Sequence, residues 1–373
     1  MKFAEFADFL AEICSHTPLA SGRSLLWTVI ANPNAGGFTI PARWKKHRAV
    51  LKAYAEKAAR NSPRGNAGSS RTAREGPDPE LGQAGLMLTE APGHAGKITQ
   101  ALIGEILSSR DHAAGGIPIG APFHLIITAG GDGTSLEVLT ALYHAPALIR
   151  SGTAILRLPM GTGNDGADAW DLDKALDFLI YPVSVDYARA LRLTTSTGKG
   201  PFLAFNILSV GLDAFVTHMT NKMKGKFPGD SYKLWVDIAS LLYDRLYKVG
   251  PMEVRAFDDS LGEFRSFQER VLLLAVGVSG NRTYGSRKHI LPDGRNVCVV
   301  RQMPLLRKLA LKGLFTTGEH INKPESQLFS ARRVEFRGEE PILAQMDGET
   351  VLLQREDYPA AIELTEPAIP ILK

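Results

Sequence analysis

The chain has 373 residues, two to three times the commonest domain size, so its length favours two domains over one. Its 44% hydrophobic and 22% charged residues are typical of a globular protein and exclude the disordered, collagen-like and disulfide-stapled classes. The 43 basic and 39 acidic residues leave a net charge of +4, too small a surplus to indicate nucleic-acid binding. The two cysteines, Cys14 and Cys298, lack the spacing of a zinc site or redox pair, so we expect a reducing, cytoplasmic compartment.

The N-terminal residues 1–24 are interpreted as an extension with a short amphipathic helix. Apolar residues such as Phe6 and Leu10 are interrupted by the acids Glu5 and Asp8, which is unlike the apolar core of a signal peptide. The longest apolar run, residues 271–278, is far shorter than the roughly 18 to 20 residues that cross a bilayer. We therefore expect no membrane-spanning segment, although such a chain can still act on lipids at an interface.

Residues 25–183 alternate short apolar runs with helical patterns, which predicts β-α-β units and a parallel sheet. The predicted strands cover residues 25–31, 86–88, 123–128 and 154–158, and the predicted helices cover residues 46–60, 96–107, 134–149 and 167–180. Residues 61–85 are rich in Gly, Ser, Pro and Arg and poor in large apolar residues, which predicts a mobile insertion loop. The first domain is therefore expected to be α/β.

After about residue 181 the pattern changes to longer stretches of β character. The predicted strands cover residues 203–210, 270–278, 296–301 and 333–336. These predict a mostly antiparallel β-rich domain over residues 184–354, and we expect residues 355–373 to pack back on the first domain.

The strongest local signal is the sequence Gly-Gly-Asp-Gly-Thr at residues 130–134, placed between a predicted strand and a predicted helix. Consecutive glycines let the backbone approach an anion, the first amides of a helix carry positive partial charge, and Thr134 can cap the helix. A carboxylate at Asp132 beside a phosphate is repelled unless Mg²⁺ bridges them or the carboxylate takes a proton from an attacking hydroxyl. The alternative is a simple strand-to-helix turn in which Asp132 is the cap.

Three further loops follow predicted strands. Residues 159–165, Pro-Met-Gly-Thr-Gly-Asn-Asp, follow the strand next to the Gly-rich loop, and loops at adjacent strand ends face one crevice in open α/β sheets. Asn164 could bind a phosphate or a base there, whereas the alternative makes Asn164 or Asp165 a helix cap. Residues 32–37 and 89–94 follow the first two strands, and each alone is only a turn.

Two Asp-Gly pairs, at Asp347 and Asp293, follow apolar residues. Asp-Gly between apolar runs is a strong signal for a short hairpin, so a plain hairpin is the alternative to a functional carboxylate. The histidines form no cluster with zinc-site spacing. The chain also lacks the G-x-S-x-G, G-x-x-x-x-G-K-[ST] and G-x-G-x-x-G patterns, which argues against a hydrolase, a P-loop NTPase and a standard dinucleotide binder.

Four motifs, taken in order, resemble the diacylglycerol kinase catalytic domain family, which includes bacterial lipid kinases and sphingosine kinases. They are N-P-N-A-G at 32–36, G-G-D-G-T at 130–134, P-M-G-T-G-N-D at 159–165 and D-G-E at 347–349. Residues 209–214 look like the segment that opens the family's second domain, so the resemblance covers nearly the whole chain from about residue 25. It implies a Rossmann-like nucleotide domain, then a β-sandwich domain, with ATP in the cleft between them.

The resemblance also implies the site residues. Asp132, Asp347 and Glu349 are the expected catalytic carboxylates, and the role of base is shared between Asp132 and Asp347. A metal is expected at Asp132 and Asp293, although the segment 284–295 is shorter than its counterpart in the family. Substrate is expected at Gly211 and Asp213. The residues expected to bind ATP are Asn32, Pro33, Gly36, Thr89, Gly130, Gly131, Gly133, Thr134, Gly161, Thr162, Gly163, Asn164 and Asp165.

By this resemblance the chain is expected to be an ATP- and Mg²⁺-dependent kinase of lipid metabolism that phosphorylates a lipid hydroxyl, such as that of diacylglycerol or a sphingoid-like alcohol. One alternative is an NAD kinase, whose family shares G-G-D-G, but the Asn-Glu pair and the G-S-T-A-Y-like stretch of that family are missing. Another is a non-catalytic lipid- or nucleotide-binding protein, against which the retained carboxylates argue. The expected partner is the lipid substrate. A homodimer is compatible with the sequence, and binding of nucleic acid is not expected.

A basic segment indicates where the chain could contact a membrane. Lys222, Lys224, Lys226 and Lys233 stand among Met223, Phe227 and Tyr232, a pattern that is attracted to anionic lipids. We therefore expect peripheral contact at the inner face of a membrane, and the alternative is a solvated loop.

Overall fold

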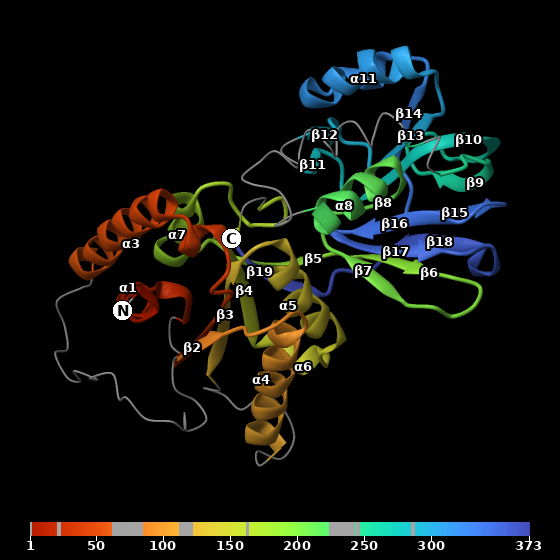
Figure 1. Ribbon diagram of the computed structural model, residues 1–373. Helices are drawn as coiled ribbons and strands as arrows, with labels where there is room; N and C mark the ends of the chain where they lie inside the picture. Colours follow the sequence, from red (N-terminus) through yellow and green to blue (C-terminus); the bar gives the residue numbers. More distant parts are fainter. Residues whose placement is uncertain are drawn as a thin grey trace. The chain divides into compact units, whose positions relative to one another are not determined.

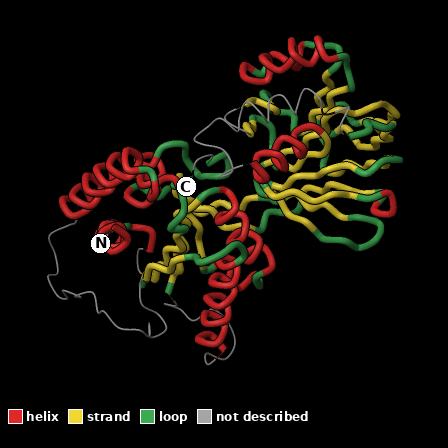
Figure 2. Tube along the Cα trace, viewed as in Figure 1, coloured by secondary structure: helices red, strands yellow, loops and turns green. Residues whose placement is uncertain are grey.

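The computed structural model describes residues 2–20, 24–61, 85–111, 122–161, 164–223, 243, 247–284 and 288–373. The chain divides into two compact units (Figure 1): unit 1 is Met1–Ala188 with Ala368–Lys373, and unit 2 is Arg189–Pro367. Helices gather in unit 1, whereas strands dominate unit 2 (Figure 2). Across the described ranges, no helix is both long and apolar enough to cross a membrane.

Unit 1 is built on a six-stranded sheet with the order β2-β1-β3-β4-β19-β5. Its first four strands, β1 (Leu25–Ala31), β2 (Gly85–Leu88), β3 (Phe123–Gly130) and β4 (Thr153–Pro159), pair in parallel. All seven residues of β4 are buried, because both faces of the sheet are covered. This burial explains why the strands appear in the sequence as continuous apolar runs.

The last two strands of this sheet come from distant parts of the chain. β19 (Ile369–Leu372) pairs in parallel with β4 and antiparallel with β5 (Val185–Ala188). The segment that returns to unit 1 is therefore residues 368–373, shorter than the 355–373 that the sequence indicated. β18 (Ala360–Leu364) remains in unit 2 because it pairs there with β15 and β6.

The helices of unit 1 cover both faces of its sheet (Figure 1). α1, α3 and α7 pack on one face and share a hydrophobic core with alternate residues of β1, β3 and β4, while α4, α5 and α6 lie on the other. The bounds are α1 Lys2–Ser15, η1 Pro18–Ala20, α2 Gly36–Thr39, α3 Pro41–Asn61, α4 His94–Asp111, α5 Asp132–His144, α6 Ala147–Ser151 and α7 Leu172–Ile180.

One helical prediction for unit 1 needs correction. The single helix predicted over residues 134–149 is two helices, α5 and α6, because Pro146 lacks a backbone N–H and stands as the N-cap of α6. The predicted N-terminal helix is confirmed as α1, and it belongs to the core of unit 1, since Phe6 and Leu10 are fully buried and Phe6 packs edge-on against Phe38, with ring centroids 5.1 Å apart. The predicted insertion at 61–85 lies almost wholly outside the described residues.

Unit 2 is built on an eleven-stranded antiparallel sheet with the order β17-β16-β8-β10-β9-β15-β18-β6-β7, to which β13 and β14 attach through β10. β10 is 15 residues long and pairs with β9 along its first part and with β8 and β13 along its second. The remaining bounds are β6 Leu191–Thr194, β7 Phe202–Ala204, β8 Ile207–Gly211, β9 Pro251–Asp258, β10 Glu263–Gly277, β13 Val297–Arg301, β14 Ser326–Phe329, β15 Arg333–Gly338, β16 Ile342–Met346 and β17 Glu349–Leu353.

Smaller elements complete unit 2. They are the two-stranded sheet of β11 (Arg282–Tyr284) and β12 (Lys288–Leu291), the helices α8 (Leu212–Met223) and α11 (Leu305–Thr317), and the short turns η2 Glu319–Asn322 and η3 Arg355–Asp357. α8 packs on β8 and β16, and α11 packs on β12 and η2. Their inner side chains join β10 and β13 in a second hydrophobic cluster. The chain therefore has an α/β unit with a parallel sheet followed by a mostly antiparallel β unit.

Candidate functional site

Three loops meet at one edge of the unit 1 sheet, where the parallel strands β1, β3 and β4 end. The amide of Asn32 donates to the carbonyl of Ala129 at 3.0 Å, and the amide of Gly37 donates to the carbonyl of Met160 at 2.7 Å. Thr89, at the end of β2, donates its amide to β1 and is itself buried. The expected nucleotide residues that are described therefore come together at the carboxyl ends of the strands, where open α/β sheets bind ligands.

The Gly-rich loop and the loop after β4 are in direct backbone contact. A methyl group added at Gly161 would lie 2.6 Å from the Cα of Gly131, and one added at Gly130 would lie 2.5 Å from Oγ1 of Thr134. Among the described residues, a methyl group at Gly131 would meet nothing closer than the Cα of Gly161, at 3.8 Å. Packing therefore requires glycine at positions 130 and 161, whereas no described residue crowds the space beside Gly131.

That open space lies at the N-terminus of α5. Gly131 is the N-cap of α5, and it has no side chain with which to cap the helix. Thr134, which the sequence offered as the cap, is buried and packs against Gly130 instead. The first amides of a helix that begins in this way can bind an anion, which the helix dipole also favours.

Asn164 shapes its own loop rather than pointing away from it. Its Oδ1 accepts from the amide of Gly161 at 2.7 Å, and its Nδ2 donates to the carbonyls of Pro159 and Gly161 at 3.3 and 3.2 Å. Its φ of 66° is the left-handed conformation that Asn tolerates better than most residues. Two expected nucleotide residues, Thr162 and Gly163, lie outside the described residues.

Asp132 is a largely buried carboxylate at the start of α5. Its Oδ1 accepts from the amide of Gly166 at 2.9 Å. Burial raises the pKa of Asp132, against the opposing effect of the backbone amides around it and of Arg157. Arg157 is already paired, because its Nη2 lies 2.6 Å from Oδ1 of Asp168. Asp132 is thus a carboxylate that burial makes a better proton acceptor than an exposed one.

Basic residues of α3 that the motifs did not single out also reach these loops. Nη1 of Arg43 donates to the carbonyl of Gly161 at 3.4 Å, and the His47 ring lies beside Gly37. Burial and the neighbouring cations Lys46 and Arg43 lower the pKa of His47, so its ring is neutral near pH 7. A usable signal was present in the sequence: positions 43, 46 and 47 have the spacing of one helix face, directly after the Asn32 loop.

In unit 2, Asp347 ties a hairpin to the rest of the sheet. Asp347 and Gly348 have φ of 47° and 105° and form the two-residue turn between β16 and β17, so the hairpin weighed from the sequence is present. The Asp347 carboxylate accepts from the amides of Phe205, Asn206 and Ile207. It is buried, whereas Glu349, the first residue of β17, is exposed.

Asp213 is the second residue of α8, which begins directly after β8. It is preceded by Gly211, which needs glycine because its φ is 93° and an added methyl would lie 2.4 Å from the carbonyl oxygen of Leu272. Oγ of Ser209 donates to Oδ2 of Asp213 at 2.7 Å, and Nε2 of Gln345 lies 3.4 Å from the same oxygen. Burial raises the pKa of Asp213 despite these donors.

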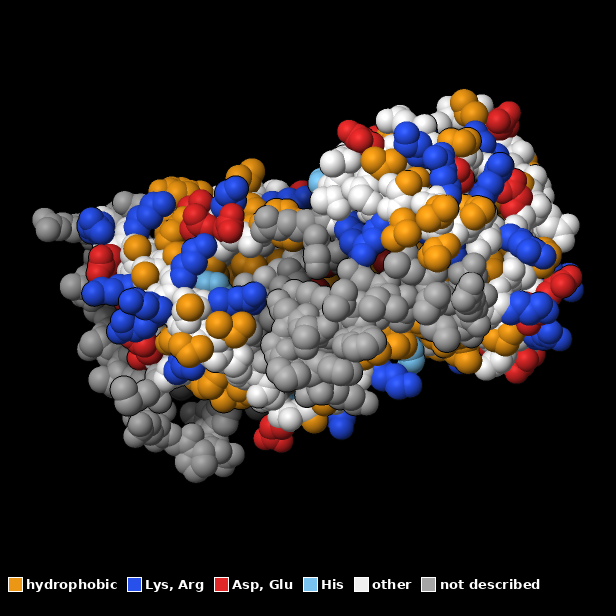
Figure 3. Space-filling view, turned by 45° about the horizontal axis from the view of Figure 1, so that its top comes forward, with side chains coloured by type: hydrophobic (Ala, Val, Ile, Leu, Met, Phe, Trp, Pro, Cys, Tyr) orange, Lys and Arg blue, Asp and Glu red, His pale blue; other side chains and the backbone are white. Residues whose placement is uncertain are grey.

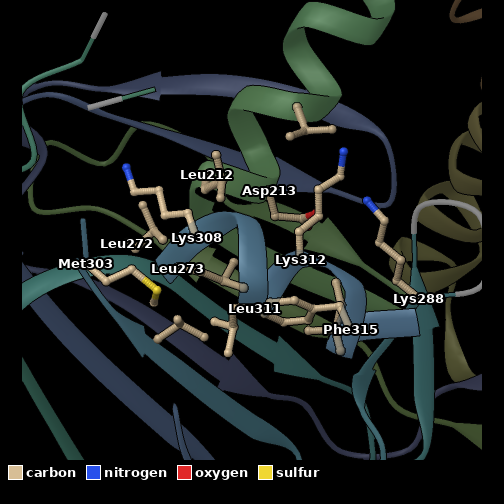
Figure 4. A pocket seen from close by; sticks show the side chains of 13 residues that line it. Leu212, Asp213, Leu272, Leu273, Lys288, Met303, Lys308, Leu311, Lys312 and Phe315 are labelled. Atoms are coloured by element: carbon tan, nitrogen blue, oxygen red, sulfur yellow. The ribbon is translucent and has the colours of Figure 1, made fainter. Parts of the chain in front are cut away.

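Asp213 lines a pocket of about 110 Å³ whose walls are mostly apolar. Figure 4 shows the apolar side chains gathered together, with the amines of three lysines, Lys288, Lys308 and Lys312, pointing away from them. The apolar wall comes from α8, β10, β12, β13 and α11, and its members are Leu212, Val216, Leu272, Leu273, Ile290, Val300, Met303, Leu311 and Phe315. The sequence had placed substrate at Gly211 and Asp213 but had not shown this wall.

Asp293 has an arginine rather than other carboxylates as its neighbour. Nε of Arg295 lies 3.1 and 3.0 Å from its two carboxylate oxygens, and this cation lowers the pKa of Asp293. Within the described ranges, no three His, Cys, Asp or Glu side chains come together in a way that could hold a metal. The metal expected at Asp132 and Asp293 therefore stays a prediction.

The fold and the site together define a chain with an α/β unit, in which a Gly-rich loop begins a helix at the carboxyl ends of the strands, and a β unit that holds a mostly apolar pocket. Residues 26–190 match the model of the diacylglycerol kinase catalytic domain, and residues 206–372 match that of the YegS C-terminal NAD kinase beta sandwich-like domain. The two matches together cover most of the sequence. The chain therefore belongs to the diacylglycerol kinase catalytic domain family, and the resemblance seen in its motifs is confirmed.

Individual relatives are distant. The chain is 28% identical over 169 residues to a probable lipid kinase YegS-like of Enterobacter sp. (strain 638), a match to 45% of this chain and 51% of that protein. It is 26% identical over 238 residues to a diacylglycerol kinase of Staphylococcus carnosus (strain TM300), a match to 61% of this chain and 70% of that protein. The match thus spans about half the length of the YegS-like protein. The solved structure of a putative diacylglycerol kinase from Bacillus anthracis has the same fold, with a TM-score of 0.56 and 17% sequence identity. The match covers 95% of this chain and 97% of that chain.

Proposed function

We propose that this chain is an ATP-dependent lipid kinase that transfers the γ-phosphoryl group of ATP to the hydroxyl group of a lipid such as diacylglycerol or a sphingoid-like alcohol. The observation that carries the proposal is the unit 2 pocket, in which one half-buried carboxylate, Asp213, stands in a wall of aliphatic and aromatic side chains. Such a wall suits an acyl chain, and a single carboxylate suits a hydroxyl group. The names of the relatives, lipid kinase and diacylglycerol kinase, support the same substrate class.

In unit 1, the phosphates of ATP would bind over the uncapped start of α5. The open side of Gly131 leaves room for a phosphate oxygen at hydrogen-bonding distance from the backbone, and Arg43 adds a positive charge at the neighbouring loop. Mg²⁺, when bound, would neutralise charge on the β- and γ-phosphates. Asp132 would contribute the carboxylate nearest to it, and the nucleotide would supply most of the remaining ligands.

In unit 2, the polar head of the lipid would lie beside Asp213. Ser209 and Gln345 hold the Asp213 carboxylate in place, so that one oxygen direction is fixed before the lipid arrives. The acyl chain of the lipid would lie against Leu273, Phe315 and their neighbours, and these side chains would exclude water from the acyl chain.

We assign the role of base to Asp132 in preference to Asp347. The acceptor oxygen attacks the γ-phosphorus, the bond from that phosphorus to the bridging oxygen breaks, ADP leaves, and the hydroxyl proton goes to the base. The Asp347 carboxylate is buried and engaged by three backbone amides, whereas the pKa of Asp132 is raised by burial although the amides of Gly166, Asp165 and Asn164 oppose that rise. A raised pKa makes Asp132 a stronger proton acceptor.

The test is transfer of labelled γ-phosphate from ATP, with Mg²⁺, to a panel of diacylglycerol, sphingosine, ceramide, a polyprenol and NAD, with Asp132→Asn alongside the wild type. Labelled lipid from the wild type and at least about a hundredfold less from the variant would support the proposal. Label in NAD alone would establish the rival NAD kinase. No labelled product, although ATP binds, would indicate a binding protein on the same fold.

A further inference from the structure

We propose that the outward face of α11 inserts into the interface of an anionic lipid bilayer and so places the unit 2 pocket directly on its lipid substrate. This inference rests on the proposed lipid kinase function, because that function explains why the pocket would need to reach a membrane. The contact between α11 and the membrane can nevertheless be tested without any kinase activity. It also differs in place from the membrane contact expected from the sequence. Of the four lysines in that expectation, Lys222 ends α8, and Lys224, Lys226 and Lys233 lie outside the described residues.

The first observation is a helix face that exposes large apolar side chains. With 3.6 residues per turn, Leu305, Leu306 and Leu309 fall on one side of α11 together with Ala310 and Gly313. The three leucines are 42%, 81% and 45% exposed. From Leu305 to Gly313 this outward face carries no charged residue, and the exposed Thr316 and Thr317 follow in the last turn, so the part before them is an apolar surface.

The second observation is the position of the positive charges. α11 contains Arg307, Lys308 and Lys312 and no acidic residue. Arg307 is exposed and pairs with Glu325 beside the helix, Lys308 is buried in the pocket lining, and Lys312 lines the same pocket half-buried. Hydrophobic and basic side chains lie side by side over the surface of unit 2 (Figure 3). Arg307 and Lys312 are therefore the cations of α11 that reach the surface, and an apolar stripe beside long cationic side chains is the chemistry of helices that lie in an anionic membrane interface.

The third observation is that the two faces of α11 serve neighbouring surfaces. Leu311 and Phe315 on its inner side line the pocket, while Leu306 and Leu309 face outward. The pocket wall and the exposed leucines therefore belong to one 13-residue helix. If the outward face lies among lipid head groups, a lipid can pass along α11 into the pocket without crossing bulk water.

A second copy of the chain is less suited to this face of α11 than an anionic membrane is. A symmetric dimer through α11 would bring two identical basic helices together, and like charges oppose that contact. Anionic lipid head groups complement the same charges. The observations therefore favour the membrane, and the dimer becomes an outcome that the experiment distinguishes.

The main experiment compares Leu306→Ser/Leu309→Ser with the wild type and with a matched control, Leu261→Ser/Phe264→Ser. The control residues are 62% and 66% exposed and lie at the end of the β9–β10 hairpin, so the control removes a similar exposed apolar area elsewhere on unit 2. Co-sedimentation is measured with vesicles of phosphatidylglycerol and phosphatidylcholine, and with phosphatidylcholine alone. We expect the α11 variant to lose roughly tenfold or more in affinity for the anionic vesicles, and the control to bind like the wild type.

Activity separates this inference from the proposed function. The α11 variant should lose phosphorylation of long-chain diacylglycerol in vesicles but keep phosphorylation of dispersed dioctanoylglycerol. Vesicle binding by the variant equal to that of the wild type would overturn the inference. So would a wild-type dimer that the leucine changes dissociate without altering vesicle binding. If α11 controls vesicle binding but no lipid is ever phosphorylated, the kinase proposal fails and the membrane contact stands.

A second measurement locates the contact. Both native cysteines, Cys14 and Cys298, are buried, so a polarity-sensitive dye on Leu306→Cys reports from α11. Its emission should move to shorter wavelength with anionic vesicles, while the same dye on Leu261→Cys should not respond. A silent dye at position 306 with vesicle-bound protein would place the contact elsewhere and refute the assignment to α11.

Discussion

The open side of Gly131 allows a test that separates nucleotide binding from folding. Gly131→Ala adds one methyl group where the nearest atom of the described residues is the Cα of Gly161, 3.8 Å away, which is an ordinary contact. The backbone at Gly131 has φ −93° and ψ −173°, a conformation open to alanine. The variant should therefore fold with nearly the stability of the wild type.

The same methyl group would occupy the space through which we expect a phosphate oxygen to reach the amides of α5. Loss of one hydrogen bond to a charged group is equivalent to about 1.5–3 kcal/mol, or roughly 10- to 150-fold in affinity. Calorimetric titration with ATP measures this change, and urea unfolding of the same sample measures stability.

Two further glycines act as controls. Gly161→Ala puts its methyl 2.6 Å from the Cα of Gly131, so the two loops must separate and stability should fall by about 1–3 kcal/mol. Gly104→Ala in α4 meets nothing within 4 Å and should leave ATP binding unchanged while raising stability by up to about 1 kcal/mol. A folded Gly131→Ala variant that binds ATP like the wild type would refute the placement of the phosphates.

Four other changes test the carboxylates. Because burial raises the pKa of Asp132, its charged form disfavours folding above that pKa. Asp132→Asn should therefore raise the free energy of unfolding near neutral pH and lose this advantage in acid, below the pKa of an exposed Asp, which unfolding at several pH values would show. The same variant should slow phosphoryl transfer at least about a hundredfold, which kinetic assays would show. Asp168→Asn leaves the buried Arg157 without its anion and should lower the free energy of unfolding by about 3–5 kcal/mol; a change below about 1 kcal/mol in urea would contradict the buried ion pair. Asp347→Ala removes the acceptor of three amides and should destabilise the fold by about 1–3 kcal/mol, whereas Glu349→Ala, at an exposed position, should leave the thermal midpoint nearly unchanged.

The sequence predicted the parts of the fold that depend on local pattern. β1 was predicted with the bounds it has, and β3 and β4 differ from their predictions by one or two residues at their ends, because strands buried on both faces appear as unbroken apolar runs. The pairing of β5 with β19 could not be predicted, since each strand has four residues and the two are far apart in the chain. For the same reason the return to unit 1 was placed too early.

The candidate site was predicted only where glycines and carboxylates stand in motifs. The motifs identified Asp347 and its turn, but not its contacts with the amides of residues 205–207, which are brought near by the pairing of β16 with β8. The leucines of α11 have the sequence pattern of a core helix. Only the structure shows that Leu306 and Leu309 face outward while Leu311 faces the pocket.

The measurement that tests the central claim most directly is phosphoryl transfer to dioctanoylglycerol by the wild type and by Val216→Trp, with the affinity for ATP measured on the same samples. Val216 lines the unit 2 pocket, and an indole ring there would fill the space that we assign to the acyl chain. We predict a loss of at least about tenfold in kcat/KM for the lipid and no change in the Kd for ATP. Equal transfer by both proteins would contradict the assignment of the pocket to the lipid acceptor.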